Sequence, residues 1–194
     1  MPATPESLTL PGPSLAQYWL TPLFFFHERR GLPFPRVHFI PGPATPEPQR
    51  SLLVQENDMT PVLTAYHGSP LQLEVLDREI GDCYLIRLVN LRRQDDLRVV
   101  ECGAIGVQLS RFPRRIRARI EEGRIPLGDI LQQEKVAHRG RPRGFFEVCA
   151  DNLVAHALGE PKGSILYGRC NELSFRDGLS FANVVEILPA SSLL

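Results

Sequence analysis

The sequence lacks closely spaced cysteines, although it contains four cysteine residues. No two of them form a CxxC pair, and no cysteine–histidine cluster has the spacing of a zinc finger. We therefore interpret them as reduced, packed thiols of a cytosolic protein. The four residues are Cys83, Cys102, Cys149 and Cys170.

The chain also lacks the short motifs of the common catalytic and nucleotide sites. No P-loop, GxSxG or HExxH sequence occurs. The pair Gly103 and Gly106 has no third glycine and no strand-to-helix context, so it is more typical of a bulge or a close backbone approach. The five histidines are scattered without metal-ligand spacing, and we expect no metal site.

No excess charge and no long hydrophobic run is present. With 22 basic and 22 acidic residues, the formal net charge is zero, so charge gives no reason to expect a nucleic-acid or membrane partner. The arginine-rich segment 113–121 is interpreted as a solvated helix face, with weak attraction of phosphates or other anionic ligands as the alternative. The stretch YWLTPLFFF is far shorter than the roughly 20 residues that cross a bilayer, and no signal peptide is recognisable. We expect a soluble, cytoplasmic protein.

What is abundant is proline, and it is concentrated at one end of the chain. Eleven of the 18 prolines lie in the first 50 residues, which cannot be regular helix or sheet throughout. We expect residues 1–50 to be a Pro-rich N-terminal extension, with a short helix around 15–26 and a linker at 41–50. A disordered arm is the alternative. Residues 51–194 would form one domain, since 194 residues suffice for one good core.

Periodicity in this domain predicts strands and helices in separate groups. Strands are expected at 71–77, 84–91 and 97–109, with RQDD as the turn of a hairpin, and at 164–175 and 179–188 around the turn RDG. Phe112, Ile116 and Ile120 recur at helical spacing, and Pro126 opens a second short helix. Hairpins with helices grouped between them indicate an α+β fold with an antiparallel sheet.

Two isolated charges interrupt apolar strands of this sheet. Arg87 lies in YLIRLV, and Glu186 lies in VVEIL. They could form a buried salt bridge, or each could lie at an edge or rim and reach water. The functional alternative is a pocket with a cation at one end, for an anionic group, and a carboxylate at the other.

The sequence resembles the chorismate lyase (chorismate pyruvate-lyase, 4-hydroxybenzoate synthase) family over roughly residues 52–190. Four pieces carry the resemblance in the family's order: ENDMT, YLIRLVNL, GRIPLG and VVEILP. The resemblance implies a single antiparallel sheet with helices on one side. It also implies a lyase that eliminates pyruvate from chorismate to give 4-hydroxybenzoate for quinone biosynthesis, without metal or organic cofactor.

The resemblance also assigns roles to four residues. Arg87 would clamp the ring carboxylate and act in catalysis, and the backbone N–H groups of Met59 and Leu127 would contact the same carboxylate. Glu186 would be the catalytic carboxylate at the other end of the ring. Chorismate would be the only partner of a monomeric enzyme.

This sequence departs from the family at one position and leaves other functions open. Ala104 stands near where some members have a second arginine, which leaves the second substrate carboxylate without a partner unless Arg92 or Arg93 replaces it. The fold also serves as an effector-binding domain of transcriptional regulators. A non-catalytic binder or carrier of an aromatic carboxylate, or an interaction module that uses the aromatic N-terminal segment, are further alternatives.

Overall fold

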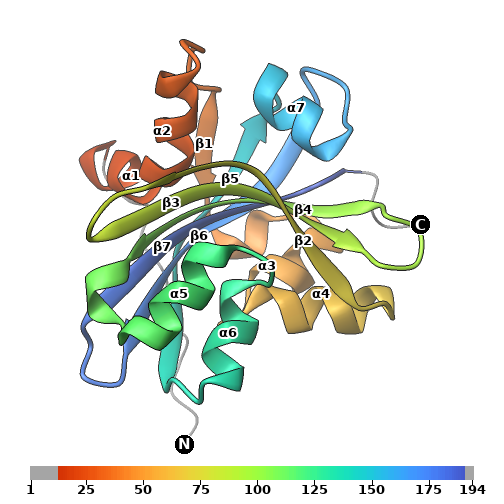
Figure 1. Cartoon of the computed structure of the whole chain (residues 1–194). Helices are drawn as coiled ribbons and strands as arrows, with labels where there is room; N and C mark the ends of the chain where they lie inside the picture. Colours follow the sequence, from red (N-terminus) through yellow and green to blue (C-terminus); the bar gives the residue numbers. More distant parts are fainter. Residues whose placement is uncertain (1–12, 191–194) are drawn as a thin grey trace, which may run out of the picture.

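The computed structural model describes residues 13–190 and is organised around one seven-stranded antiparallel sheet (Figure 1). The strand order is β1-β5-β6-β7-β4-β3-β2, so the three strands β2, β3 and β4 form one half of the sheet. The expected single antiparallel sheet is confirmed. The strands are β1 (Val37–Ile40), β2 (Leu71–Ile80), β3 (Tyr84–Arg93), β4 (Val99–Gln108), β5 (His138–Cys149), β6 (Ile165–Phe175) and β7 (Ser180–Leu188).

Short turns join the strands that the sequence pattern predicted. β3 and β4 form the expected hairpin, and its turn includes Leu97 with a φ of 61°. β6 and β7 pair across the RDG turn, where Gly178 has a φ of 86° that an L-residue rarely adopts. Glycine at this position therefore fixes the turn that brings the last two strands together.

Helices cover both faces of the sheet, rather than the one face that the resemblance implied (Figure 1). On one face lie α1 (Pro13–Trp19), α2 (Thr21–Arg29) and α7 (Asn152–Leu158), and on the other lie α3 (Gln49–Leu53), α4 (Met59–His67), α5 (Arg114–Glu122) and α6 (Leu127–Gln133). Two 3-10 turns, η1 (Gly42–Ala44) and η2 (Leu109–Arg111), complete the chain's regular elements within residues 13–190.

Strand alternation divides the core between these faces. On β3, Ile86 and Leu88 pack in the cluster formed with α2 and α7. Their neighbours Leu85 and Leu91 pack in clusters formed with the helices of the opposite face. Arg87 lies between Leu85 and Leu91 in this second series, so its side chain points towards α3–α6 and not towards α2.

The segment before residue 51 contributes to the same sheet. Val37–Ile40 pairs with β5, which makes β1 an edge strand. The helix expected around 15–26 is two helices, and the second begins at Thr21 with Pro22 in its first turn. The expected linker 41–50 contains η1 and the start of α3, so the boundary expected between residues 50 and 51 falls inside α3.

Residues 13–190 contain neither a membrane-spanning helix nor a cluster of metal-ligating side chains. None of their helices has the length and apolar character needed to cross a membrane. Within the same range, no three His, Cys, Asp or Glu side chains are grouped as they would be around a metal ion.

Candidate functional site

A cavity of about 80 Å³ lies between the sheet and the starts of α4 and α6. This is several times the roughly 10–15 Å³ that one water molecule needs. The strands β3, β4, β6 and β7 contribute its floor. Most of its wall is apolar and includes Met59, Leu73, Val89, Ile105, Leu127 and Val184.

The strand register explains why charged side chains from different strands meet in this cavity. Glu186 of β7 lies beside Gly103 of β4, which in turn lies beside Val89 of β3. Arg87 is two residues from Val89 on β3 and therefore shares its face. Arg87 and Glu186 both line the cavity, from strands that β4 separates.

Arg87 is a buried cation without a complete set of partners. Its side chain is 2% exposed, and its Nε and Nη1 atoms have no hydrogen-bond partner among residues 13–190. Burial, and then the charge of Arg78, lower the pKa of Arg87 to about 10. Arg78 lies opposite it on β2 and donates a hydrogen bond to the Glu121 carbonyl at 2.9 Å. The site therefore holds a guanidinium whose counter-ion is not supplied by the described residues.

Glu186 is ion-paired, but with Arg169 and not with Arg87. Arg169 lies beside it on β6, is fully buried, and donates from Nε to the Glu186 carboxylate. The other Arg169 nitrogens donate to the carbonyls of Leu53 at 3.3 Å, Gln55 at 2.8 Å and Asn57 at 3.1 Å. Arg169 therefore fastens the segment between α3 and α4 to the sheet while it neutralises Glu186.

Two further buried polar side chains line the cavity, and sequence reasoning missed both. Glu101 of β4 is 4% exposed and Asn171 of β6 is 3% exposed. The Glu101 Oε2 and Asn171 Oδ1 atoms find no hydrogen-bond partner within the described part of the chain. Burial, followed by the charge of Glu186, holds the pKa of Glu101 well above its ordinary value, while Arg169 opposes this shift.

The Glu101 carboxyl group lies where a side chain at position 103 would otherwise be, and residue 103 is glycine. A Cβ atom at Gly103 would stand 3.1 Å from Glu101 Oε1 and 3.3 Å from Val89 Cγ2. Such contacts are tighter than ordinary van der Waals packing. Of the pair Gly103 and Gly106, Gly103 is therefore a position of close approach between neighbouring groups, and it lies in this cavity.

Met59 and Leu127 are the first residues of α4 and α6, and both line the cavity. The first N–H groups of a helix have no acceptor inside the helix, so a helix start favours an anion. The N-cap residue of α4 is Asp58, whose carboxylate accepts a hydrogen bond from His138 at 3.0 Å and caps no N–H of its own helix. The structure thus brings all four residues named by the resemblance to one cavity.

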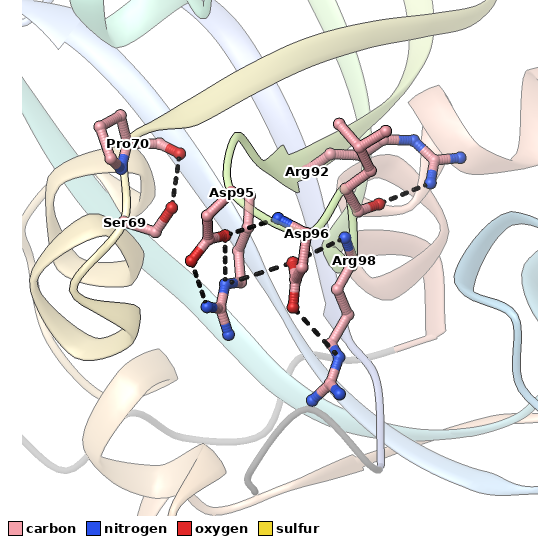
Figure 2. Close-up of polar contacts among 8 residues, drawn as sticks. Ser69, Pro70, Arg92, Asp95, Asp96 and Arg98 are labelled. Carbon is pink, nitrogen blue, oxygen red and sulfur yellow. Dashed lines mark hydrogen bonds and ion pairs between the residues drawn. The ribbon is translucent and has the colours of Figure 1, made fainter.

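Among residues 13–190, no second cation lines the cavity in place of the arginine that some members of the resembled family have near Ala104. Ala104 lies on the opposite face of the sheet, in the cluster with α2 and α7. Arg92 donates to Glu74 at 2.6 Å, and Arg93 donates to Asp95 at 3.0 Å. Figure 2 shows Arg92, Asp95 and Asp96 near the β3–β4 turn. Neither arginine lines the cavity. Within residues 13–190 the cavity has Arg87 as its one cation without a hydrogen-bonded carboxylate.

One signal in the sequence could have found the missed charges. Glu101 stands alone in VVECGAIGV and Arg169 stands alone in ILYGRC, as Arg87 and Glu186 do in their strands. An isolated charge in a predicted apolar strand marks all four. Which of them pair depends on strand order and register, which the pattern does not contain.

The comparisons with known proteins found similarity in structure only. No protein-family model and no curated protein sequence matches this chain. The crystal structure of PhnF from Mycobacterium smegmatis is 12% identical, with a TM-score of 0.57 over 73% of this chain and 67% of that one. The separate effector domain of PhnF is 11% identical, with a TM-score of 0.55 over 70% of this chain and 90% of that domain.

A third solved structure has the same fold. It is the ligand-binding domain of a protein described as a GntR-family transcriptional regulator from Bordetella bronchiseptica. That domain is 12% identical, with a TM-score of 0.50, and the match covers 62% of this chain and 86% of the domain.

The expected chorismate pyruvate-lyase activity is wrong. The structural neighbours instead include the effector domain of PhnF and the ligand-binding domain of a protein described as a GntR-family transcriptional regulator. The site itself gives two physical reasons. Glu186, expected to face the leaving group, is instead ion-paired with Arg169. Chorismate carries two carboxylates, and the cavity has one unneutralised cation. What the comparisons establish is the fold, an α+β antiparallel sheet of the chorismate lyase-like type.

Proposed function

We propose that this domain binds a small organic acid reversibly, as an effector-sensing domain, through the cavity that contains Arg87. The observation that carries the proposal is the orphaned guanidinium. A buried charged group without hydrogen-bond partners is strongly unfavourable, and native proteins seldom retain one unless a ligand uses it. A carboxylate in the cavity would accept hydrogen bonds from Nε and Nη1, the two Arg87 atoms that lack partners.

The rest of the cavity favours an aromatic or similarly apolar acid. Its wall consists mostly of aliphatic side chains, which match an apolar ring and cannot hydrate a highly polar ligand. The backbone N–H groups of Met59 and Leu127, at the starts of α4 and α6, would add donors for the same carboxylate. The polar atoms of Glu101 and Asn171 would contact the other end of the ligand.

The known domains of this fold support a binding function. PhnF from Mycobacterium smegmatis has an effector domain, and the Bordetella bronchiseptica neighbour is a ligand-binding domain. A sensing domain requires reversible binding. Arg87 has two nitrogens that can bind a ligand, and Glu186 is held in its ion pair with Arg169. Catalysis would instead require an acid free to transfer a proton.

Calorimetric titration with 4-hydroxybenzoate tests the proposal. We expect saturable 1:1 binding by the wild type and a loss of affinity of about 30-fold or more in Arg87→Met, because each hydrogen bond to a charged group contributes roughly 1.5–3 kcal/mol. Arg92→Met is the matched control, since Arg92 is ion-paired outside the cavity. Equal binding by the wild type and Arg87→Met would disprove the proposal.

A further inference from the structure

Two buried carboxyl groups line the cavity, and Arg169 is hydrogen-bonded to one of them. Glu186 and Glu101 both line the cavity, and β4 places Gly103, two residues from Glu101, directly opposite Glu186. The guanidinium of Arg169 reaches Glu186 through Nε, and its two terminal nitrogens donate to three backbone carbonyls. No hydrogen bond joins Arg169 to Glu101 in the described structure, and Glu101 Oε2 has no partner there.

The charges around Glu101 determine its protonation state. If both carboxyls were ionised, two negative charges would lie near each other in a mostly apolar cavity. Arg169 is the cation that acts on Glu101, since Arg87 lies opposite Ile105, four residues further along β4. Adjacent buried carboxyls avoid two such charges by retaining a proton on one of them. Glu186 has the ion pair, so the proton belongs on Glu101.

We propose that Glu101 is a neutral acid that donates a hydrogen bond to the ligand, and that it restricts the cavity to ligands with one negative charge and a neutral oxygen acceptor at the far end. This inference rests on the proposed function. Arg87 contributes one positive charge and the Arg169–Glu186 pair contributes none. A monoanion is therefore neutralised in the cavity, whereas a dianion leaves one buried negative charge beside Glu186.

The groups around Glu101 agree with this state. Glu186 on β7 disfavours its ionisation, Arg169 on β6 favours it, and burial has the largest effect, which keeps the pKa of Glu101 well above its ordinary value. From the other elements, Arg87 of β3 and Asp58 at the start of α4 also line the cavity. Asp58 is hydrogen-bonded to His138 and lies outside the Arg169–Glu186 pair.

The sheet places the two ligand-binding ends apart. Arg87 lies opposite Ile105, and Glu101 is four residues from Ile105 on β4. At ~3.4 Å per residue and ~4.8 Å between strands, the Arg87 and Glu101 Cα atoms are roughly 14 Å apart. The side chains extend into this interval, and a six-membered ring with para substituents is a ligand of suitable shape for it.

The test compares two probes of nearly equal shape and different charge. 4-Carbamoylbenzoate has one carboxylate and a neutral amide at the para position, whereas terephthalate has a carboxylate at both ends. We expect the wild type at pH 7 to bind 4-carbamoylbenzoate at least tenfold more tightly than terephthalate. Glu101→Gln, which keeps a hydrogen-bond donor, should bind 4-carbamoylbenzoate within about threefold of the wild type, and Glu101→Leu should bind it at least tenfold more weakly.

An infrared difference spectrum of the wild type minus Glu101→Gln, without ligand, tests the neutral acid separately. The carbonyl band of a protonated carboxylic acid is expected at pH 7. Its absence, or equal affinity for the two probes, would overturn the inference. An ionised Glu101 would also be revealed by a tenfold gain in terephthalate affinity in Glu101→Gln. Failure of both probes to bind while the infrared band is present would instead refute the proposed function.

Discussion

Replacing Arg87 with methionine should stabilise the ligand-free protein while it abolishes ligand binding. Arg87 is buried on β3, and its Nε and Nη1 atoms have no partner within residues 13–190. Folding therefore removes a charged group from water without replacing all of its hydrogen bonds. Methionine retains much of the aliphatic stem that packs against the cavity wall and removes the charge.

The pKa of Arg87 gives the magnitude. Its decrease from the ordinary value of an arginine to about 10 corresponds to roughly 3 kcal/mol, at ~1.4 kcal/mol per unit. Because the folded-state pKa is lower than the unfolded one, the charged form is disfavoured by folding. This penalty is fully present below about pH 10 and disappears as the pH rises towards the ordinary pKa of an arginine. Loss of some packing offsets part of the gain, so we expect Arg87→Met to be about 1–3 kcal/mol more stable at pH 7.

Urea denaturation at pH 7, with thermal unfolding as a second measurement, checks this magnitude. The unfolding midpoint temperature should rise by roughly 2–12 °C, because 1 kcal/mol corresponds to about 2–4 °C in a chain of this size. Arg92→Met, which breaks an exposed ion pair with Glu74, should change stability by less than about 1 kcal/mol. If Arg87→Met were destabilised by more than 1 kcal/mol without ligand, Arg87 would have a stabilising partner and the reasoning would fail.

Two further predictions follow from the groups around the cavity. Glu186→Gln should destabilise the fold by about 3–5 kcal/mol, because it leaves Arg169 buried without its counter-ion. Glu101→Gln should change stability by less than about 1 kcal/mol. Similar losses of stability for both variants in urea denaturation would contradict the proposal that Glu186 is ionised and Glu101 is neutral. Asp58 raises the pKa of His138 by accepting its hydrogen bond, so this contact contributes stability that is fully present below pH 6.5 and is lost as the pH rises through the folded-state value. Asp58→Asn should remove that part of the pH dependence, and an unchanged profile of unfolding midpoint against pH would exclude the contact as its source.

The regular part of the fold was predictable because its strands are either alternating or continuously apolar. β3 and β7 were expected within two residues of their observed ends, since Tyr84–Arg93 and Ser180–Leu188 are bounded by turn residues. β5 was missed. Its first half, HRGRPRG, contains glycine, proline and three arginines, and its pairing with β6 is irregular between Pro142 and Gly144. Tertiary pairing with strands on both sides outweighs the poor local propensity.

The sequence predicted residues of the candidate site but not which of their charged side chains pair with one another. Arg87 and Glu186 were found because each is a lone charge in an apolar strand, and both line the cavity. Their relation was left open between a salt bridge and a ligand pocket. The register decides this, because it places Arg169 and not Arg87 beside Glu186. Such a pairing joins residues far apart in the sequence, and local patterns carry no information about it.

A crystal structure of the protein with 4-carbamoylbenzoate tests the central claim most directly. The account predicts the probe's carboxylate within hydrogen-bonding distance of Arg87 Nε and Nη1, and its amide oxygen beside Glu101. A cavity that contains only water at saturating probe concentration, or a probe bound with its carboxylate away from Arg87, would contradict it.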